Sequence, residues 1–197
     1  MKKWLVLALL AIGVLMAQQN EYVGVNKCKM CHNKTKSGAQ YKVWSASPHA
    51  KAFEALKSEA AAKIVQERGI KTNAWETPEC VKCHTTGFGQ GGYEIKDETF
   101  WNPAPDDKDG KKAVKRMAGL QNVTCEACHG AGSGYKSMKT MKGLYSGTIE
   151  PASVGLTIPD EKTCVKCHNE ESPSYKPFDY KTYVAKIAHN IPEDYGK

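Results

Sequence analysis

A short apolar run opens the chain, and a sequence of mixed polarity follows it. Two lysines precede the apolar stretch from Trp4 to Met16, and Ala17 follows it. A charged start, a short apolar run and a small residue are typical of a cleaved secretory signal peptide. The run is shorter than the roughly 20 residues of a membrane-spanning helix, and an uncleaved anchor is the alternative. The pattern predicts a signal peptide over residues 1–17 and one domain over residues 18–197.

Helical patterns are few in the remainder, and long polar stretches separate them. Ser47-Pro48 predicts the start of an alanine-rich helix that runs toward Gly69. A second helix is predicted over residues 180–189, ended by the asparagine and proline that follow. Residues 100–110, with two prolines and four charges, predict a surface loop. The predicted fold is mainly α with long loops and little or no β-sheet.

All eight cysteines of the chain fall into one motif, C-x-x-C-H. The pairs are Cys28 and Cys31, Cys80 and Cys83, Cys125 and Cys128, and Cys164 and Cys167, followed in turn by His32, His84, His129 and His168. Two thiols at this spacing reach the two vinyl groups on one edge of a porphyrin. The next residue then lies under the iron, where histidine supplies the proximal nitrogen. The motifs predict four covalently bound haems c.

Paired cysteines have two other common uses in proteins. Pairs of C-x-x-C also build zinc sites, and exported proteins carry disulfide frameworks. Neither explains why a histidine follows the second cysteine every time. With four haems on the roughly 180 residues that remain, the macrocycles must supply much of the apolar core and lie close together.

The chain is basic, but its charge does not predict nucleic-acid binding. The formal charge is +7 and the mean hydropathy is −0.54, and loss of the signal peptide removes two lysines. The propionates of four haems would bring the total closer to neutral. The predicted partners are redox proteins, for which a local lysine patch would steer an acidic partner. No stable membrane insertion is predicted, and the protein is expected to be a monomer or a weak oligomer.

The second axial ligands are too few for four irons. The chain has six histidines, so His49 and His189 remain for four distal positions. The alternatives are a solvent-exposed His49 and a His189 that interacts with a helix C-terminus. Methionine sulfur is the next candidate, and Met117, Met138 and Met141 remain outside the signal peptide and the motifs. Each methionine alone is more often packing material.

Two further sequences imitate known motifs. Residues 87–92 satisfy G-x-G-x-x-G, but they follow a haem motif and no helix pattern opens after them. Glycine backbone packed against a macrocycle is the better explanation. Residues 106–110 resemble part of a calcium-binding EF-hand loop, but Pro105 and Arg116 would occupy the first and twelfth ligand positions. A solvated turn is predicted there.

The chain resembles the cytochrome c-554 family, the tetrahaem carriers of ammonia-oxidising bacteria. The similarity covers most of the mature chain, and its most specific piece is the Gly87-Phe88-Gly89-Gln90 sequence. The matching stretches are Lys27 through the first motif, Ser47 to Glu54, Cys80 to Ile95, Val123 to Gly132 and Tyr175 to Phe178. The resemblance implies that the first and third haems stack, as do the second and fourth.

The resemblance also implies particular iron ligands. It gives His49 as the distal ligand of the third haem, at His129. It gives His189 as the distal ligand of the fourth haem, at His168.

For the other two haems, this chain departs from the family. Where the family has the distal histidine of the first haem, the chain has Met138, with Met141 as the competitor; either sulfur implies a higher potential. The second haem, at His84, is implied to be open, with Lys176-Pro177-Phe178 on its distal side. Lys176 replaces a small polar residue, and ligation of the iron, a hydrogen bond to an anion and an outward position are its alternatives.

Three functions remain open at this point. The first is a periplasmic electron carrier that passes electrons between redox proteins, as the family does downstream of hydroxylamine oxidoreductase. The second is reduction of a small nitrogen oxide, such as nitric oxide, at the open haem of His84. The third is a subunit of a multihaem filament or conduit, with ligands donated between chains.

Overall fold

The computed structural model describes residues 19–189, 191 and 192, so the predicted signal peptide lies outside the described residues. The described helices are α1 (Val25–His32), α2 (Gln40–Ala46), α3 (Ala52–Ala55), α4 (Glu59–Glu67), α5 (Pro78–His84), α6 (Glu98–Trp101), α7 (Lys108–Ala118), α8 (Cys125–His129), α9 (Met138–Tyr145), α10 (Glu161–Cys164) and α11 (Tyr180–Val184). Within these ranges the only β-type pairing is one isolated bridge between Thr85 and Gln121. The predicted mainly α fold with long loops is confirmed.

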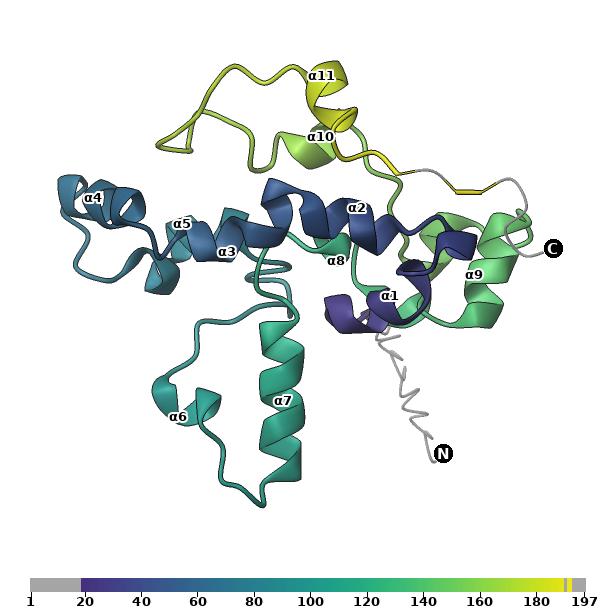
Figure 1. Cartoon of the computed structure of the whole chain (residues 1–197), viewed down its shortest axis with the longest axis horizontal. Helices are drawn as coiled ribbons and strands as arrows, with labels where there is room; N and C mark the ends of the chain where they lie inside the picture. The colour runs from purple at the N-terminus through teal and green to yellow at the C-terminus, as the bar shows by residue number, and fades with distance from the viewer. Residues whose placement is uncertain (1–18, 190, 193–197) are drawn as a thin grey trace, which may run out of the picture.

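The molecule is elongated, and its elements are spread along one axis (Figure 1). Helix α4 lies at one end, and α9 lies at the other end. Helices α2, α3 and α5 follow the long axis between them. Helices α6 and α7 form an arm on one side of this axis, and α10 and α11 lie on the opposite side. None of the four C-x-x-C-H motifs lies in the α6–α7 arm.

The helix predicted from Ser47 to Gly69 is wrong as one element. Pro48 occupies the first turn of a 3-10 helix, η2 (Pro48–Lys51), which passes into the short α3. A separate helix, α4, then begins after Ser58. The Ser58 hydroxyl caps it by accepting a hydrogen bond from the backbone N–H of Ala61. Gly69, at φ 68°, follows the end of α4, as predicted.

The surface loop predicted over residues 100–110 is also corrected. Helix α6 overlaps its start, and α7 overlaps its end. The Asp107 carboxylate caps α7 by accepting a hydrogen bond from the N–H of Gly110 at 2.8 Å. Only residues 102–107 between the two helices remain irregular. Capping by Asp107 therefore outweighs the turn-forming residues around it.

The C-terminal helix is shorter than predicted. Asp179 caps α11 through the N–H of Thr182 at 2.8 Å, but the α-helix ends at Val184 and not at His189. A turn covers residues 185–187. The chain then runs back toward α9, where the Tyr145 hydroxyl donates to the carbonyl of Pro192 at 3.4 Å. The early end of α11 lets His189 leave this helix.

The glycine-rich turn after the second motif packs against a tyrosine. Gly87 has φ 69°, and a Cβ atom at this position would lie 2.6 Å from Cζ of Tyr22. The Tyr22 hydroxyl in turn donates to Oε1 of Gln90 at 3.3 Å. Within the chain, the close approach predicted for this glycine is therefore made to an aromatic ring.

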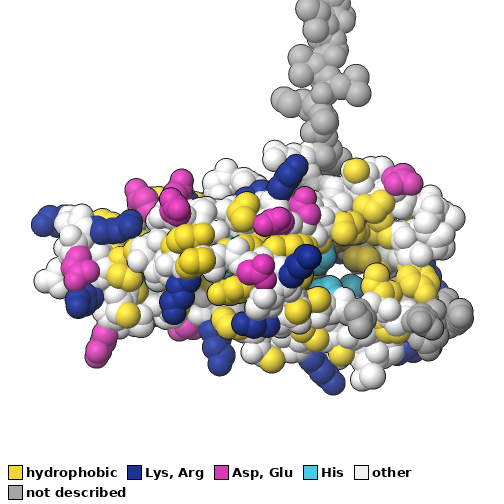
Figure 2. Space-filling model, turned by 90° about the horizontal axis from the view of Figure 1, so that it is seen from above, with side chains coloured by type: hydrophobic (Ala, Val, Ile, Leu, Met, Phe, Trp, Pro, Cys, Tyr) yellow, Lys and Arg dark blue, Asp and Glu magenta, His cyan; other side chains and the backbone are white. Residues whose placement is uncertain are grey.

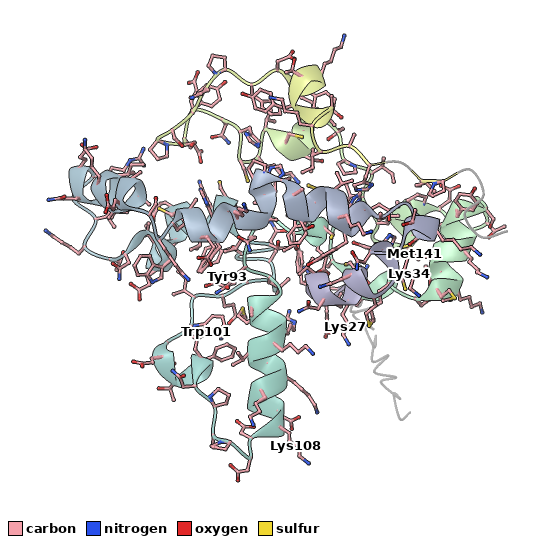
Figure 3. All side chains as sticks on the ribbon, viewed as in Figure 1. Lys27, Lys34, Tyr93, Trp101, Lys108 and Met141 are labelled. Atoms are coloured by element: carbon pink, nitrogen blue, oxygen red, sulfur yellow. The ribbon has the colours of Figure 1, made fainter. Side chains whose placement is uncertain are left out.

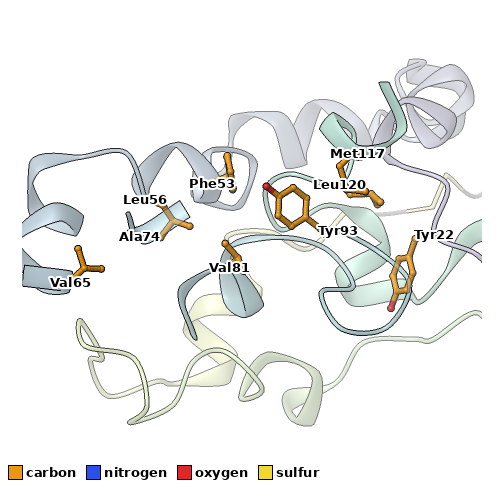
Figure 4. Packing of buried hydrophobic residues seen from close by; sticks show 9 residues of the cluster. All are labelled: Tyr22, Phe53, Leu56, Val65, Ala74, Val81, Tyr93, Met117 and Leu120. Carbon is orange, nitrogen blue, oxygen red and sulfur yellow. The ribbon is translucent and has the colours of Figure 1, made fainter. Parts of the chain in front are cut away.

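A small apolar core lies around the second motif and extends from Val65 in α4 to Met117 in α7 (Figure 4). Its members are Tyr22, Phe53, Leu56, Val65, Ala74, Val81, Tyr93, Met117 and Leu120. Val81 lies inside the second motif and is fully buried. Other large apolar side chains remain exposed, among them Met30 (64%) and Met138 (67%). The protein core thus anchors one of the four motifs.

Candidate haem-binding site

Local helix formation presents the cysteines and histidine of each motif. Helices α1, α5 and α8 each end at the motif histidine. The fourth motif begins at the end of α10 and continues in a turn through His168. Helix α10 begins with a capping box, in which Asp160 and Thr163 bond to each other's backbone N–H groups. Residues three apart lie on one face of a helix, so both thiols of a motif can face the same porphyrin edge.

The thiols are available for attachment. All eight cysteines are free in the structure. Across the described ranges, no group of three or more His, Cys, Asp or Glu side chains is arranged to hold a metal ion. The motifs thus offer separate thiol pairs, which is the arrangement that four separate porphyrins need.

Three proximal histidines are held by hydrogen bonds in the orientation that haem ligation requires. Nδ1 of His32 lies 3.1 Å from Oε1 of Gln40. Nδ1 of His84 lies 2.5 Å from the Ala52 carbonyl, and that of His129 lies 3.0 Å from a backbone carbonyl in the loop before α10, at Thr157. Because each partner is a carbonyl oxygen, Nδ1 must donate, and Nε2 is left with its lone pair for a metal. The residues present therefore fit a haem iron.

The two surplus histidines lie opposite motif histidines. The ring centroids of His49 and His168 are 6.0 Å apart, and those of His189 and His129 are 5.9 Å apart. Imidazole nitrogens bind a first-row metal at about 2 Å, so two nitrogens that share one iron lie about 4 Å apart and their ring centroids about 6 Å apart. Both ring pairs have the separation that a shared iron requires.

The pairs are exchanged relative to those that the resemblance implied. His49 faces the fourth motif and not the third, and His189 faces the third and not the fourth. The C-terminal segment explains the second pair, because after α11 it returns to α9 and carries His189 past the fourth motif. A distal role for both histidines remains a prediction, with these two partners.

The electrostatics of these rings suit metal binding. Burial lowers the pKa of His49, and the neighbouring His168 adds to the effect. Burial also lowers the pKa values of His129, His168 and His189. A lowered pKa keeps each imidazole neutral near pH 7, and the neutral ring is the form that binds a metal.

The motifs lie close to one another in a definite order. A thiol–thiol hydrogen bond joins Cys28 to Cys125; with burial it raises the pKa of Cys28, and it lowers the pKa of Cys125. Helix α1 packs against α8 at the same place. The first motif is therefore adjacent to the third.

The second motif is adjacent to the fourth. A hydrogen bond with Cys167 lowers the pKa of Cys83 to about 7. Beside it, Nζ of Lys82 lies 2.6 Å from Oε2 of Glu171, just after the fourth motif. The third and fourth motifs also approach each other, because Thr157, in the loop that leads to α10, is hydrogen-bonded through its backbone to His129. The spatial order is first, third, fourth, second.

The first motif opens into a cavity of about 330 Å³. Cys28, Cys31 and His32 line it together with Met138 and Met141. Figure 2 shows a hollow on one face of the molecule, with histidine side chains inside it and hydrophobic side chains around it. The structure brings both candidate methionines to the first motif, and the choice between them remains a prediction.

The third methionine candidate has a structural role. Met117 is 3% exposed, and its sulfur accepts a hydrogen bond from the N–H of Glu94 at 3.2 Å. It belongs to the apolar core described above. Met117 is therefore removed from the ligand candidates.

The segment expected over the second haem has mixed positions. The Phe178 ring stacks on His168 with centroids 4.7 Å apart, and Lys176 and Pro177 are exposed. The ion pair between Lys82 and Glu171 ties the start of this segment to the second motif. A distal role of Lys176, Pro177 and Phe178 at His84 remains a prediction.

Sequence reasoning missed the residues that hold the motifs in place. Glu126, inside the third motif, is 1% exposed. Its Oε1 accepts from the N–H groups of Val23 (2.8 Å) and Gly132 (2.7 Å), and its Oε2 from that of Gly24 (2.7 Å). An acidic residue between two haem-binding cysteines was the available signal. The carbonyl partners of the proximal histidines carry no such signal, because any residue provides a carbonyl.

The chain is similar to known proteins in both sequence and structure. The family described as "Cytochrome c554 and c-prime" matches residues 27–102. Cytochrome c-554 of Nitrosomonas europaea is 30% identical over 178 residues, which cover 85% of this chain and 66% of that protein. The structure of reduced cytochrome c554 from the same organism matches with a TM-score of 0.52 and 27% identity, over 85% of this chain and 78% of that chain. Since the 30% identical relative and the similar structure each match 85% of this chain, the chain belongs to the cytochrome c-554 family, and its cofactors are four haems c.

Proposed function

We propose that the protein is a periplasmic electron carrier, exported by a signal peptide over residues 1–17 and working as one domain over residues 18–197. The observation that carries this proposal is the contact between motifs. Helix α1 packs against α8, which joins the first motif to the third, and the Lys82–Glu171 ion pair joins the second motif to the segment after the fourth. Haem c supplies reversible one-electron chemistry when bound. The chain holds the four attachment sites close together, so that bound haems would lie near one another.

The ligand geometry supports a carrier role as well. His49 and His189 would each complete the coordination of one iron, which favours electron transfer over substrate binding at those two sites. Gln40 and the carbonyls of Ala52 and Thr157 hold the proximal rings. Among the described helices, none is long and apolar enough to cross a bilayer.

The test is a haem count combined with a redox titration of the purified protein. A pyridine haemochrome assay should return four haems per chain, and each should be reduced and reoxidised reversibly. Mass spectrometry of the exported protein should place its N-terminus at Gln18. A colourless product, or far fewer than four haems per chain, would reject the proposal.

A second function, binding and reduction of a small nitrogen oxide, would use the second haem. In the described ranges, both surplus histidines face other motifs, which leaves His84 without a distal histidine. Ferrous protein should then take up carbon monoxide or nitric oxide at one haem, and the oxidised protein should show one high-spin signal in low-temperature EPR. If neither gas changes the spectrum, the protein is a carrier only.

A further inference from the structure

Positive charge is concentrated in two segments that are far apart in sequence. Residues 22–53 and 127–149 together hold nine lysines and no aspartate or glutamate. The whole chain has 28 basic and 21 acidic residues, so elsewhere the two signs are nearly balanced. The segregation is therefore local and is not a consequence of the net charge.

Both segments meet at the cavity of the first motif. Five exposed lysines line that cavity, and no acidic residue does. These five residues, called the lysine rim below, are Lys27, Lys34, Lys36, Lys136 and Lys142. Figure 3 labels two of them, Lys27 and Lys34, near Met141 at the α1–α9 end of the molecule. The rim thus brings together residues 27–36 and residues 136–142.

The rim lysines have no ion-pair partners in the part of the chain that the structure describes. The ion pairs there use other lysines: Lys57, Lys63, Lys82, Lys96 and Lys112. Like charges this close repel one another, and an isolated domain gains nothing from keeping them unpaired. A surface that retains such a field favours a partner of opposite charge.

The other end of the motif series is different. Lys82 of the second motif is neutralised by Glu171 at 2.6 Å. Around the fourth motif both signs occur, with Asp160 and Glu161 beside Lys162 and Lys166. Of the four motifs, only the first contributes residues to the cavity that the five lysines line.

An exposed apolar side chain lies next to the rim in the sequence. Met30, inside the first motif and three residues after Lys27, is 64% exposed. Protein interfaces typically combine apolar contacts with a polar or charged border. The charges steer the encounter, and the apolar contacts permit close approach.

We infer that the lysine rim is the docking surface for an acidic electron-transfer protein, which places this partner over the first motif and not over the other three. The inference rests on the proposed carrier function. The alternative role for the rim is to neutralise the propionates of the first haem, and the experiment below separates the two.

The test compares two double variants with equal changes in net charge. Lys34→Glu/Lys142→Glu reverses charge on both sides of the rim. Lys108→Glu/Lys115→Glu reverses the same charge on α7, in the arm, and is the control. The probe is flavodoxin, a small acidic flavoprotein, and calorimetry measures its affinity for the haem-loaded protein at low and at raised sodium chloride.

At low salt, the rim variant should bind flavodoxin at least about tenfold more weakly than the wild type does. Raised sodium chloride should also lower the affinity of the wild type, because salt screens the attraction between opposite charges. The control should stay within about threefold of wild type, because a distant charge acts only through the overall field.

Three results would overturn the inference. They are absence of salt-dependent binding by the wild type, an equal loss in both variants, and a rim variant that shifts the potential of the first haem while its affinity is unchanged. The last result would assign the rim to the propionates. All of these are measured on protein with four haems, so they differ from a failure of the carrier function, which would appear as missing haem.

Discussion

Glu126 links two haem-binding motifs through one buried carboxylate. It lies in the third motif, and it accepts hydrogen bonds from the backbone at Val23 and Gly24, the entrance to α1. It also holds Gly132, in the segment that leads to the cavity of the first motif. No buried side-chain polar atom of the described residues lacks a partner, so this charge is compensated by three donors. The contact between the first and third motifs depends on it.

Glu126→Gln should therefore destabilise the folded protein. An amide presents one acceptor and one donor, so one backbone N–H that now meets a carboxylate oxygen would face an N–H₂ group. Hydrogen bonds to charged groups contribute about 1.5–3 kcal/mol each, and we expect the free energy of unfolding to fall by about 2–3 kcal/mol in chemical denaturation. Glu79→Gln, at an exposed position next to the second motif, should change it by less than about 0.5 kcal/mol. Equal effects of both variants would contradict the role of Glu126.

Replacing Met138 and Met141 by leucine, one at a time, shows which of the two ligates the first haem. Only one sulfur can occupy the sixth position of the first haem, and we predict that it is Met138. Met138→Leu should then convert one low-spin iron to high spin in EPR, remove the sulfur-to-iron charge-transfer band and lower one potential. Met141→Leu should leave all three unchanged. The opposite result would assign Met141, and no change in either variant would exclude a methionine ligand.

At the scale of elements, short capped helices present the motifs. Helix α10 is four residues long, too short to be stable alone, and its start depends on Asp160 and Thr163. The hydrogen bond from the Thr163 N–H lowers the pKa of the Asp160 carboxyl below 3.8. The fourth motif begins at the last residue of this helix, so its cap positions Cys164.

The contribution of Asp160 should depend on pH in a defined direction. Because its pKa is lower in the folded state, the cap stabilises the protein at pH values above 3.8 and loses this effect as the carboxyl is protonated in the folded state. Asp160→Asn should therefore be less stable than wild type at neutral pH, and the two should converge in acid. Denaturation curves over a pH series measure this. Asp106→Asn, in the exposed loop before α7, should follow wild type throughout.

The elements also show which parts of the fold the sequence predicts. The cysteine motifs predict the haem attachment sites because spacing and chemistry are local. Capping residues are local as well, yet Ser58 and Asp107 were overlooked, and the boundaries of α4 and α7 were missed. The partners of His49 and His189 depend on where the chain returns after α11, and no local pattern encodes that path. The resemblance supplied a pairing, and the structure exchanged it.

At the scale of the whole molecule, the two ring pairs determine how the motifs are connected. With His49 at the fourth motif, the segment before α3 ties the N-terminal half to the C-terminal part. With His189 at the third motif, the last described residues reach back to the centre. The chain thus closes over the two interior motifs of the series first, third, fourth, second.

This arrangement predicts which haem loses a ligand in each of two variants. In His49→Leu, the haem bonded to Cys164 and Cys167 should become high spin, and the haem bonded to Cys125 and Cys128 should not. His189→Leu should give the reverse. Two-dimensional NMR of the reduced protein measures this, because the thioether bridges identify each haem by its cysteines and a high-spin iron shifts and broadens only nearby signals.

Each variant is the control for the other, since both remove one imidazole and differ only in its place. The pairing implied by the family resemblance predicts the opposite assignment in both variants, so one pair of spectra decides between them. If His49 and His189 were surface residues, neither haem would change. The 6.0 Å and 5.9 Å ring separations leave space for one metal atom in each pair, and this geometry requires that each substitution affects a single, different haem.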